Sequence, residues 1–399
     1  MKQKKKNPMK AGDFILTLLV SALVVFGIIM VFSASYYSSI SETGDPYAYL
    51  KDHLMWAVLG GGLMLLTASL DYHIYGRYAK PLLAVSILLL LLLFTPLGVT
   101  RNYATRWIGV AGFTIMPGEI AKICAIVFVA WFLSSRPQRI HSLQKGILPL
   151  LGLCAVYFGL IVKQPNLSTA ITVCGIIIGM MFVAGLRWIY LGGLGCVGVL
   201  GIFAMIFMDP DGYRLRRFTT FLDPFQDKLG SGWQVIQSLL ALGSGGLFGV
   251  GLGKSIQKTL YLPEPQNDFI FSIIGEELGF AGCLVLIVVY LLLIWKGADV
   301  SLKAPDLFGM LLGSGITIML GLQVLLNIAV VTSSMPPTGI TLPFVSYGGN
   351  ALLLFMGSFG ILLNISRQTF REEKIPGAKE RITPLRPLSQ LQKLDRRKK

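Results

Sequence analysis

The feature that most constrains this chain is the repeated occurrence of apolar stretches long enough to cross a lipid bilayer. Residues 14–32 form a run of about 20 residues without a charge, which is the length that a transmembrane helix needs. Of the 399 residues, 54% are hydrophobic and 14% are charged, against roughly 25% charged residues in soluble domains. Such a chain is a polytopic membrane protein, which excludes a disordered chain, a secreted disulfide scaffold and a soluble enzyme.

Ten apolar stretches of about 17 to 25 residues alternate with polar or Gly/Pro-rich segments. We expect each stretch to form one transmembrane helix, so the predicted fold class is all-α and polytopic. Between the seventh and eighth stretches, residues 209–269 are predicted to form a large extracellular loop. The ten stretches are residues 13–35, 54–70, 80–97, 117–134, 147–163, 168–185, 188–208, 270–295, 307–331 and 350–366.

The distribution of basic residues indicates the orientation of the chain in the membrane. With the N-terminus inside, 24 of the 35 Lys and Arg residues fall in cytoplasmic segments and 10 fall outside, as the positive-inside rule requires. We therefore expect cytoplasmic tails at residues 1–12 and 367–399, on either side of a membrane domain at 13–366. The net charge of +15 is interpreted as a signal of topology and of contact with membrane lipid, not of nucleic-acid binding.

Histidine and cysteine indicate neither a metal site nor a redox site. The three histidines lie in three different polar segments, without a second ligand at metal spacing. The five cysteines lie inside apolar stretches, where a small buried hydrophobic residue is the usual interpretation. These residues leave a metal requirement undetermined and predict no disulfide.

Apolar residues recur at helical spacing within the long loop, between positions 233 and 243. We expect a helix that lies on the membrane surface with its apolar face toward lipid. The glycine-rich segment 243–253 follows and leaves the backbone free to turn tightly. The apolar face holds Trp233, Ile236, Leu239 and Leu240, and the opposite face holds Gln234, Gln237 and Ser238.

Two charged residues inside the fourth stretch, Glu119 and Lys122, are three positions apart and share one helical face. An ionisable side chain within a span is costly and usually has a partner. We expect these two to pair, either to fix helix packing or to line a substrate cavity. Just before them, Arg101, Arg106 and Trp107 stand in a short outside loop, where they would anchor the interface or bind an anionic lipid headgroup.

The densest group of polar residues at a membrane boundary lies in residues 261–280. Asp268 has apolar neighbours there, and a partly desolvated carboxylate has a raised pKa unless a cation offsets it, which suits a general base near neutral pH. A carboxylate that caps the eighth helix explains the same spacing. Glu276 and Glu277 lie two turns deeper and are compatible with a proton or cation path, so an enzyme and a transporter both remain open.

The last outside segment, residues 333–350, is uncharged and contains three prolines. Non-helical backbone beside a bilayer is tolerated where it is buried in protein or lines a wet cavity. We interpret this segment either as a re-entrant cavity wall or as a simple loop between two spans.

Four segments, in the expected order, resemble the SEDS proteins, named for shape, elongation, division and sporulation. They read IMVFSAS, GSGWQVIQSLLALGSGGLFGVGLGKSIQK, YLPEPQNDFIFSIIGEELG and PPTGITLPFVSYGG. The resemblance extends over residues 13–367 and is closer to the FtsW and SpoVE branch than to RodA. It implies a ten-span SEDS fold and a peptidoglycan glycosyltransferase that polymerises lipid II at the outer face of the bacterial cytoplasmic membrane, for division or sporulation.

The resemblance also implies partners and a topology. A class B penicillin-binding protein would crosslink the new strand, alongside other divisome or sporulation membrane proteins. Both termini would be cytoplasmic and the active site extracytoplasmic. A lipid II flippase and a non-catalytic scaffold for the penicillin-binding protein are the alternatives, and the flippase would need a polar path through the bilayer.

By the same resemblance, Asp268 corresponds to the essential carboxylate of the family, Glu119 and Lys122 to its intramembrane pair, and Arg106 and Trp107 to its RW pair. Asp268 would accept the proton of the acceptor hydroxyl during glycosyl transfer. No cofactor is certain, and either basic side chains or a divalent cation, Mg²⁺ or Mn²⁺, would stabilise the diphosphate. The substrate-binding candidates are Arg101, Arg106, Trp107, Lys254, Lys258, Glu264, Ser346, Tyr347 and Gly348.

The chain departs from the family pattern at four positions. Gly118 stands where Ser or Ala is usual, and Asn350 follows SYGG in place of Ser. Asn166 and Ser168 replace the Asp and Gly of a QPDLG motif. The change at Asn166 puts in doubt any charge-based role of that position and leaves Asp268 unaffected.

Overall fold

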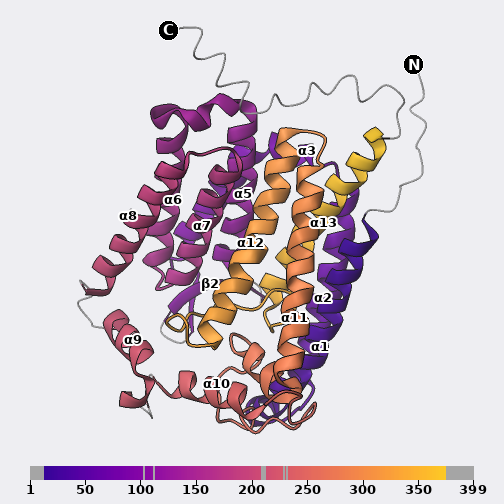
Figure 1. Cartoon of the computed structure of the whole chain (residues 1–399), viewed down its shortest axis with the longest axis vertical. Coiled ribbons are helices and arrows are strands. Elements are labelled where there is room, and N and C mark those ends of the chain that lie inside the picture. Colours follow the sequence, from indigo (N-terminus) through magenta and orange to yellow (C-terminus); the bar gives the residue numbers. More distant parts are fainter. Residues whose placement is uncertain are drawn as a thin grey trace.

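A bundle of long helices forms the body of the protein (Figure 1). The computed structural model describes residues 13–101, 104–110, 113–207, 213–227, 230 and 232–373. Each of the ten stretches predicted to span the membrane is helical over most of its length. The long helices are α1 (Phe14–Thr43), α2 (Ala48–Ser69), α4 (Ala79–Leu92), α5 (Pro117–Ser135), α6 (Leu148–Val162), α7 (Leu167–Val183), α8 (Trp188–Phe207), α11 (Ile270–Leu302), α12 (Leu307–Val331) and α13 (Gly349–Glu373).

Six helices within the described residues are long and apolar enough to cross a bilayer by themselves. They are α1, α5, α6 with the turn before it, α11, α12 and α13. The count of ten crossings therefore stays a prediction. The predicted membrane domain ends at residue 366, whereas α13 continues to Glu373, and both predicted tails lie outside the described residues apart from the end of α13.

Shorter elements connect the long helices. A three-stranded antiparallel sheet, in the order β1 (Gly98–Arg101), β2 (Ala104–Val110), β3 (Phe113–Ile115), fills the connection between α4 and α5. The all-α prediction missed this sheet, whose strands pair locally and satisfy backbone groups that a bare loop would leave open. The others are α3 (His73–Arg77), α9 (Tyr213–Leu222), α10 (Trp233–Ser244), two 3₁₀ turns (Pro137–His141 and Pro224–Asp227) and a π turn (Leu143–Ile147).

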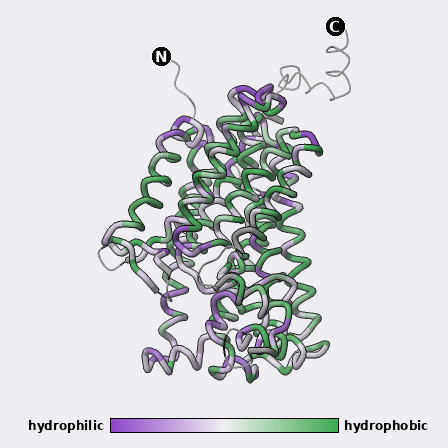
Figure 2. Tube along the Cα trace, turned by 90° about the vertical axis from the view of Figure 1, so that its left-hand side faces the viewer, coloured by the Kyte–Doolittle hydropathy of each residue, from purple (hydrophilic) through white to green (hydrophobic). Residues whose placement is uncertain are grey.

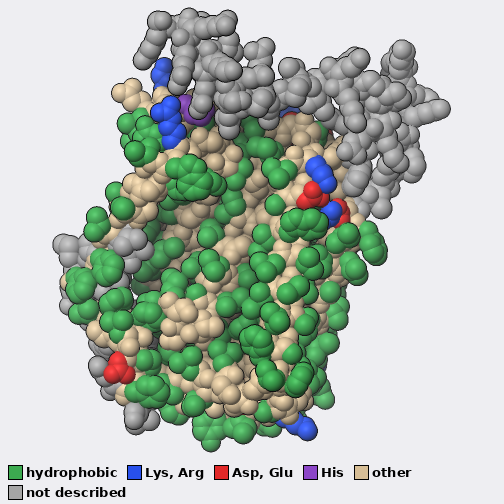
Figure 3. Space-filling model, in the orientation of Figure 1, with side chains coloured by type: hydrophobic (Ala, Val, Ile, Leu, Met, Phe, Trp, Pro, Cys, Tyr) green, Lys and Arg blue, Asp and Glu red, His purple; other side chains and the backbone are tan. Residues whose placement is uncertain are grey.

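The surface of the bundle matches a lipid environment. Hydrophobic residues run along the helices, and hydrophilic residues gather toward the two ends (Figure 2). Figure 3 shows one face covered by apolar side chains, with charged side chains near its upper and lower margins. Side chains such as Val58 and Leu65 of α2 and Leu291 of α11 are exposed on the bundle surface, as expected where lipid replaces water.

The start of α1 and the end of α13 lie at the same end of the bundle (Figure 1). There, Lys296 Nζ lies 2.8 Å from Asp13 Oδ2, which joins α11 to the residue that caps α1. Arg367 of α13 donates a hydrogen bond of 3.0 Å to the carbonyl oxygen of Ala68, near the end of α2. The opposite end holds α9, α10 and the turn between α1 and α2 (Figure 1).

The polar face of α10 is the face that packs against the bundle. Gln237 and Ser238 are buried together with Ile236, whereas Leu239 and Leu240 are exposed. Ser238 Oγ lies 2.7 Å from Ser272 Oγ and donates a 2.8 Å hydrogen bond to the carbonyl of Val331. The prediction of a lipid-facing apolar face is right for Leu239 and Leu240 and wrong for Ile236, which packs inward. It also did not foresee that the polar face packs on protein, where hydroxyl groups between helices form hydrogen bonds.

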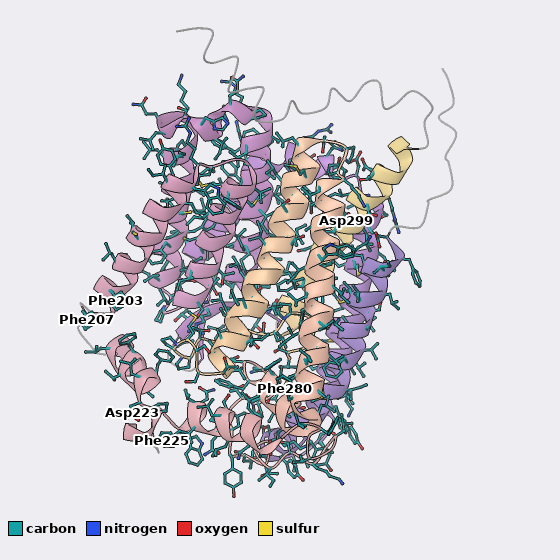
Figure 4. All side chains as sticks on the ribbon, in the orientation of Figure 1. Phe203, Phe207, Asp223, Phe225, Phe280 and Asp299 are labelled. Atoms are coloured by element: carbon teal, nitrogen blue, oxygen red, sulfur yellow. The ribbon has the colours of Figure 1, made fainter. Side chains whose placement is uncertain are left out.

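Helix α11 is interrupted at Gly279, which has φ 69° and ψ −169°. The loop after α10 pairs with this break through four backbone hydrogen bonds of 2.9–3.0 Å: Val250 to Glu276, Gly251 to Glu277, Phe280 to Gly246 and Ala281 to Leu247. Backbone groups freed by a helix break in a membrane need such partners. Figure 4 marks the place, with Phe280 toward the lower end of α11 and Asp299 near its other end.

Candidate functional site

Asp268 lies in the turn that leads into α11 and is half-buried. Its backbone carbonyl accepts a 2.8 Å hydrogen bond from Nδ2 of Asn327. The same nitrogen donates to the carbonyl of Ile340 at 2.7 Å, and Asn327 is 1% exposed. One amide of α12 therefore holds the Asp268 turn against the segment 333–348.

Arg106 reaches the same place from β2. A side-chain carbon added to Gly339 would lie 3.4 Å from Asp268 Oδ2 and 3.5 Å from Arg106 Nη1, so both groups border this glycine. Arg106 Nη2 donates a 2.6 Å hydrogen bond to the carbonyl of Pro165, just before α7. A carboxylate and a guanidinium from distant parts of the sequence thus meet at one point.

The segment 333–348 runs into the bundle and is not a surface loop. Residues 342–346 are all buried. A side-chain carbon on Gly27, in the middle of α1, would lie 2.5 Å from the carbonyl oxygen of Phe344, and Tyr290 of α11 donates a hydrogen bond of 2.5 Å to the carbonyl of Pro343. Of the two interpretations of this segment, the contacts favour the re-entrant wall over the simple loop.

Three predicted substrate residues lie at the end of this segment. Ser346 closes a turn, because its Oγ accepts a 2.8 Å hydrogen bond from the amide of Leu342. The amide of Tyr347 donates to the carbonyl of Gln266 at 2.9 Å, two residues before Asp268. Gly348 follows directly. Ser346 is therefore structural in this geometry, and Tyr347 connects its segment to the Asp268 turn.

The intramembrane pair that the spacing predicts is present. Lys122 Nζ lies 2.7 Å from Glu119 Oε1, with side chains that are 3% and 11% exposed. Gly118, beside them in the first turn of α5, faces Thr169 of α7, since an added side-chain carbon would lie 3.1 Å from Thr169 Cγ2. The pair is available both to fix this packing and to present charge, and its functional role stays a prediction.

Two further candidate residues, Trp107 and Arg101, lie in the small sheet. Trp107 is half-buried and pairs with Val99 of β1. Arg101 ends β1, where it pairs with Ala104, and its side chain lies outside what the structure describes. Asn350, the residue that replaces the family's serine, donates a 2.8 Å hydrogen bond to the carbonyl of Thr114 and so ties β3 to α13.

Two lysines of the long loop have opposite surroundings. Lys254 is exposed, whereas the side chain of Lys258 is 3% exposed. Lys258 Nζ lies 2.7 Å from Glu277 Oε1 and 2.9 Å from Ser33 Oγ. Lys258 is therefore held in an internal ion pair that joins the loop to α1 and α11. The bonding partners of its ammonium group lie on these two helices.

Glu276 is also held by the loop. Its carboxylate accepts hydrogen bonds from Ser255 Oγ and from the backbone amides of Ile256 and Gln257. Glu276 and Glu277 are the two carboxylates whose position in the sequence suggested a proton or cation path. In the structure both are bonded, Glu276 to the loop and Glu277 to Lys258.

Glu264 lies at an exposed turn with φ 50°, and its carboxylate accepts a hydrogen bond from Asn267. Partial burial and then the negative charge of Glu42 raise its pKa above the ordinary value. The surroundings of Glu264 are therefore electronegative.

Metal binding by protein side chains alone is not favoured at this site. Within the residues that the structure describes, no group of three His, Cys, Asp or Glu side chains is arranged to hold a metal ion. Asp268 has a guanidinium as its neighbour at Gly339 instead of a second carboxylate. The described side chains alone do not form a complete ligand set, and a cation of the Mg²⁺ or Mn²⁺ type held jointly by a carboxylate and the substrate diphosphate stays a prediction.

Sequence reasoning missed three contributors to the site: Asn327, Gly339 and the carbonyl of Pro165. Asn327 could have been recognised from the sequence, because a side-chain amide within an apolar span is costly unless it has hydrogen-bond partners. Gly339 and Pro165 could not have been recognised in this way, since their role depends on how distant segments pack. The charge change at Asn166 is tolerated locally, because its side chain accepts a 3.3 Å hydrogen bond from Thr169 N and caps α7 as Asp would.

The chain belongs to the FtsW/RodA/SpoVE family, because the family model described as "Cell cycle protein" matches residues 14–371. Stage V sporulation protein E of Bacillus subtilis (strain 168) is 42% identical over 368 residues, which cover 92% of this chain and 99% of the relative. A probable peptidoglycan glycosyltransferase FtsW of Geobacter sp. (strain M18) is 40% identical over 355 residues, with coverage of 89% and 96%. The resemblance read from the sequence is confirmed.

Solved structures agree with this assignment. A chain of a peptidoglycan synthase complex, described as coordinating polymerization and crosslinking, superposes with a TM-score of 0.75 at 31% identity, covering 90% of this chain and 99% of the solved one. The crystal structure of the rod shape determining protein RodA of Thermus thermophilus gives 0.67 at 30% identity, with coverage of 90% and 98%. Family and fold together identify a multi-pass membrane protein.

Proposed function

We propose that this chain is a peptidoglycan glycosyltransferase that polymerises lipid II into glycan strands at the outer face of the cytoplasmic membrane, for division or sporulation. The observation that carries the proposal is the meeting of Asp268 and Arg106 at Gly339. The names of the relatives support the same activity.

Asp268 acts as the general base in this proposal. Its carboxylate accepts the proton of the 4-hydroxyl of the acceptor sugar while that oxygen attacks the anomeric carbon of the donor chain. The new glycosidic C–O bond forms as the bond from the anomeric carbon to the diphosphate breaks, with inversion, and the lipid diphosphate leaves with the electron pair. A single base suffices because the leaving group needs less protonation than a sugar hydroxyl would.

Arg106 stabilises the negative charge that develops in this reaction. Its guanidinium is fixed by the Pro165 carbonyl and stands beside the base, so little reorganisation is needed as charge moves to the diphosphate. Lys258 is not assigned this role because Glu277 and Ser33 already hold it. No step is assigned to a divalent cation, whose requirement stays a prediction.

The flippase alternative receives less support from the geometry. It needs a polar path through the bilayer, for which the candidates are Glu119, Lys122, Glu276 and Glu277. Glu119 and Lys122 pair with each other, and the carboxylates of Glu276 and Glu277 are bonded to Ser255, loop amides and Lys258. A third possibility, a scaffold without chemistry, does not require a carboxylate and a guanidinium beside each other. The polymerase uses both groups.

The proposal includes a location and partners. Both termini are cytoplasmic, and the Asp268 turn faces the other side, in keeping with the common end shared by the start of α1 and the end of α13. A class B penicillin-binding protein crosslinks the strand, and other divisome or sporulation proteins join the complex. A structural relative that belongs to a peptidoglycan synthase complex supports such a partnership.

The first test measures polymerisation of lipid II in proteoliposomes by the full chain together with its penicillin-binding partner, whose transpeptidase serine is inactivated. Asp268→Asn and Asp268→Ala are expected to lose about 100- to 10,000-fold in rate, the usual contribution of a general base. Asp223→Asn, which alters an exposed carboxylate of the same long loop (Figure 4), is expected to retain the wild-type rate.

All variants are compared after thermal unfolding confirms that they are folded and co-purification confirms that they hold the partner. Strands made by both Asp268 variants at the wild-type rate would remove Asp268 from the mechanism. Wild-type protein that moves lipid II across the bilayer without forming strands would establish the flippase instead.

A further inference from the structure

An open surface hollow of about 470 Å³ lies between the α1–α2 turn and Tyr347. We call it the tyrosine pocket. It adjoins the candidate site, because the amide of Tyr347 is bonded to Gln266, two residues before Asp268. The lining residues are Thr43, Ala48, Tyr49, Lys51, Asp52, Met55 and Tyr347.

The two tyrosine rings of the pocket are held in fixed positions. Tyr347 Oη donates a 2.6 Å hydrogen bond to Asp52 Oδ2, and the ring of Tyr49 lies edge-on to that of Tyr347 with centroids 5.0 Å apart. Tyr49 Oη in turn donates a 2.6 Å hydrogen bond to Glu42. A ligand therefore meets preformed aromatic surfaces, which lowers the entropic cost of binding.

Asp52 supplies an acceptor to the pocket. Only its Oδ2 is engaged by Tyr347, and among the described residues no donor is bonded to Oδ1. Asp52 is half-buried, so this oxygen can accept hydrogen bonds from hydroxyl groups of a ligand. A few polar groups among apolar and aromatic ones is the usual composition of a small-molecule site.

The charge around the pocket disfavours a phosphate group. Lys51 Nζ is 2.7 Å from Asp45 Oδ2, whose carboxylate offsets its positive charge. Glu42 and Glu264 add negative charge near Tyr49, and the charge of Glu42 contributes to the raised pKa of Glu264. An isoprenoid tail is disfavoured by Asp52, whose charge an apolar ligand would desolvate. A neutral, hydroxyl-rich ring with apolar faces satisfies both conditions.

We propose that the tyrosine pocket binds a sugar ring of the growing glycan strand, at a position remote from the diphosphate. This inference rests on the proposed function, since it names where the polymer lies relative to the reacting end. The sugar places an apolar face on Tyr49 and donates a hydroxyl hydrogen bond to Asp52. Such a subsite retains the strand between additions and so lengthens the product.

Binding is tested first, without any reaction. The full-length Asp268→Asn protein in nanodiscs is titrated with a soluble, uncrosslinked GlcNAc–MurNAc tetrasaccharide that carries neither peptide nor lipid, and binding is followed by saturation-transfer NMR. Adding Tyr49→Ala is expected to weaken binding about tenfold or more, equivalent to at least about 1.4 kcal/mol. Adding Asp52→Asn, which keeps the side-chain volume, is expected to weaken it less, and each protein is checked by its thermal unfolding midpoint.

Tyr37→Ala is the matched control, because Tyr37 is an exposed tyrosine of α1 that does not line the pocket. It should bind the tetrasaccharide like the parent protein. Equal binding by the Tyr49, Asp52 and Tyr37 variants, or no binding by the parent, overturns the proposal. If lipid II binding alone depends on Tyr49 and the soluble glycan does not bind, the pocket belongs to the incoming substrate and the assignment to the strand is wrong.

Strand length gives the second measurement. Compared at equal consumption of lipid II, the Tyr49→Ala enzyme with Asp268 intact should make shorter strands than wild type or Tyr37→Ala. Unchanged lengths would refute a retention role. A wild-type protein that forms no strands at all would overturn the proposed function, and the binding measurement would still decide whether the pocket takes a sugar.

Discussion

Asn327 is the residue on which the backbone of the candidate site depends most directly. It is buried in α12, and its single amide nitrogen joins the carbonyls of Asp268 and Ile340. Asn327 does not touch the reacting atoms in the proposed mechanism, and we regard it as a positioning residue for Asp268.

Replacing Asn327 by Leu should lower kcat for lipid II polymerisation by about 10- to 100-fold, because two partly buried carbonyls would each lose a donor, at about 1–3 kcal/mol per unpaired group. KM should change little, since the substrate-binding side chains are untouched. Steady-state kinetics in proteoliposomes separates the two constants.

The comparison variant for this experiment is Asn350→Ala, which removes one side-chain hydrogen bond to Thr114, a residue of β3. It should retain most of the wild-type kcat. A rise in KM with constant kcat in Asn327→Leu would mean that Asn327 contacts substrate, which contradicts a positioning role.

At the scale of elements, the loop after α10 is joined to α11 by an ion pair as well as by backbone hydrogen bonds. The side chains of Lys258 and Glu277 are 3% and 0% exposed, and Ser33 of α1 contacts both. Removal of one member of a buried ion pair leaves an uncompensated charge, which costs far more than the pair itself contributes. The loop is therefore fixed to two helices at this point.

Lys258→Met should destabilise the protein by about 3–5 kcal/mol, as is typical when a buried charge loses its partner. Lys254→Met, at an exposed position earlier on the same loop, should have little effect. The double change Lys258→Met with Glu277→Leu should recover most of the loss. Thermal unfolding midpoints in one detergent measure all three, and a double variant less stable than Lys258→Met would contradict the ion-pair explanation.

The elements also differ in how far the sequence could predict them. The positions of the long helices follow from the length of apolar stretches, and the Glu119–Lys122 pair follows from their spacing. The break at Gly279 was not predicted, because residues 270–295 read as one continuous apolar span. The packing of the polar face of α10 against protein was not predicted, since α11 and α12 supply hydrogen-bond partners that no local pattern reveals.

The candidate site was predictable in its residue types and not in its geometry. Asp268 and Arg106 were both predicted as site residues, the first by its position at a membrane boundary. Their approach at Gly339 depends on the packing of β2, the α11 turn and the segment 333–348, which are far apart in sequence. The tyrosine pocket was not predicted either, since Tyr49 and Asp52 carry no motif by themselves.

At the scale of the whole molecule, the end opposite the candidate site is held by a polar cluster. His73 Nδ1 lies 2.7 Å from Asp71 Oδ1, and its Nε2 lies 2.8 Å from Asp306 Oδ2 at the start of α12. Gln368 of α13 donates a 3.1 Å hydrogen bond to Asp71. The cluster therefore links the connection after α2 with α12 and α13.

This cluster predicts a dependence of stability on pH. Burial acts to lower the pKa of His73, but the hydrogen bonds to Asp71 and Asp306 outweigh it and raise the pKa above 6.5. A raised folded-state pKa contributes stability that is fully present below pH 6.5 and is lost as pH rises through the raised value. Because His73 is half-exposed, we expect a small effect, about 1–3 °C in the unfolding midpoint.

The measurement compares unfolding midpoints of wild type and His73→Gln between pH 6 and pH 9, roughly the range in which a histidine of raised pKa titrates. The wild-type protein should be the more stable at the acidic end, and the difference should shrink toward the basic end. A difference that is constant across this range would show that protonation of His73 does not stabilise the fold.

The facing glycines at the break in α11 restrict which sequences this fold can accept. A side-chain carbon on Gly279 would overlap the backbone nitrogen of Gly249, and one on Gly249 would overlap the carbonyl oxygen of Glu277. Both also have left-handed backbone, with φ of 69° and 81°. Because the obstacle is main chain, no compensating side-chain change can make room. A substitution at either glycine alone should therefore disrupt the break in α11. Sequence divergence in this part of the protein is restricted to the other positions.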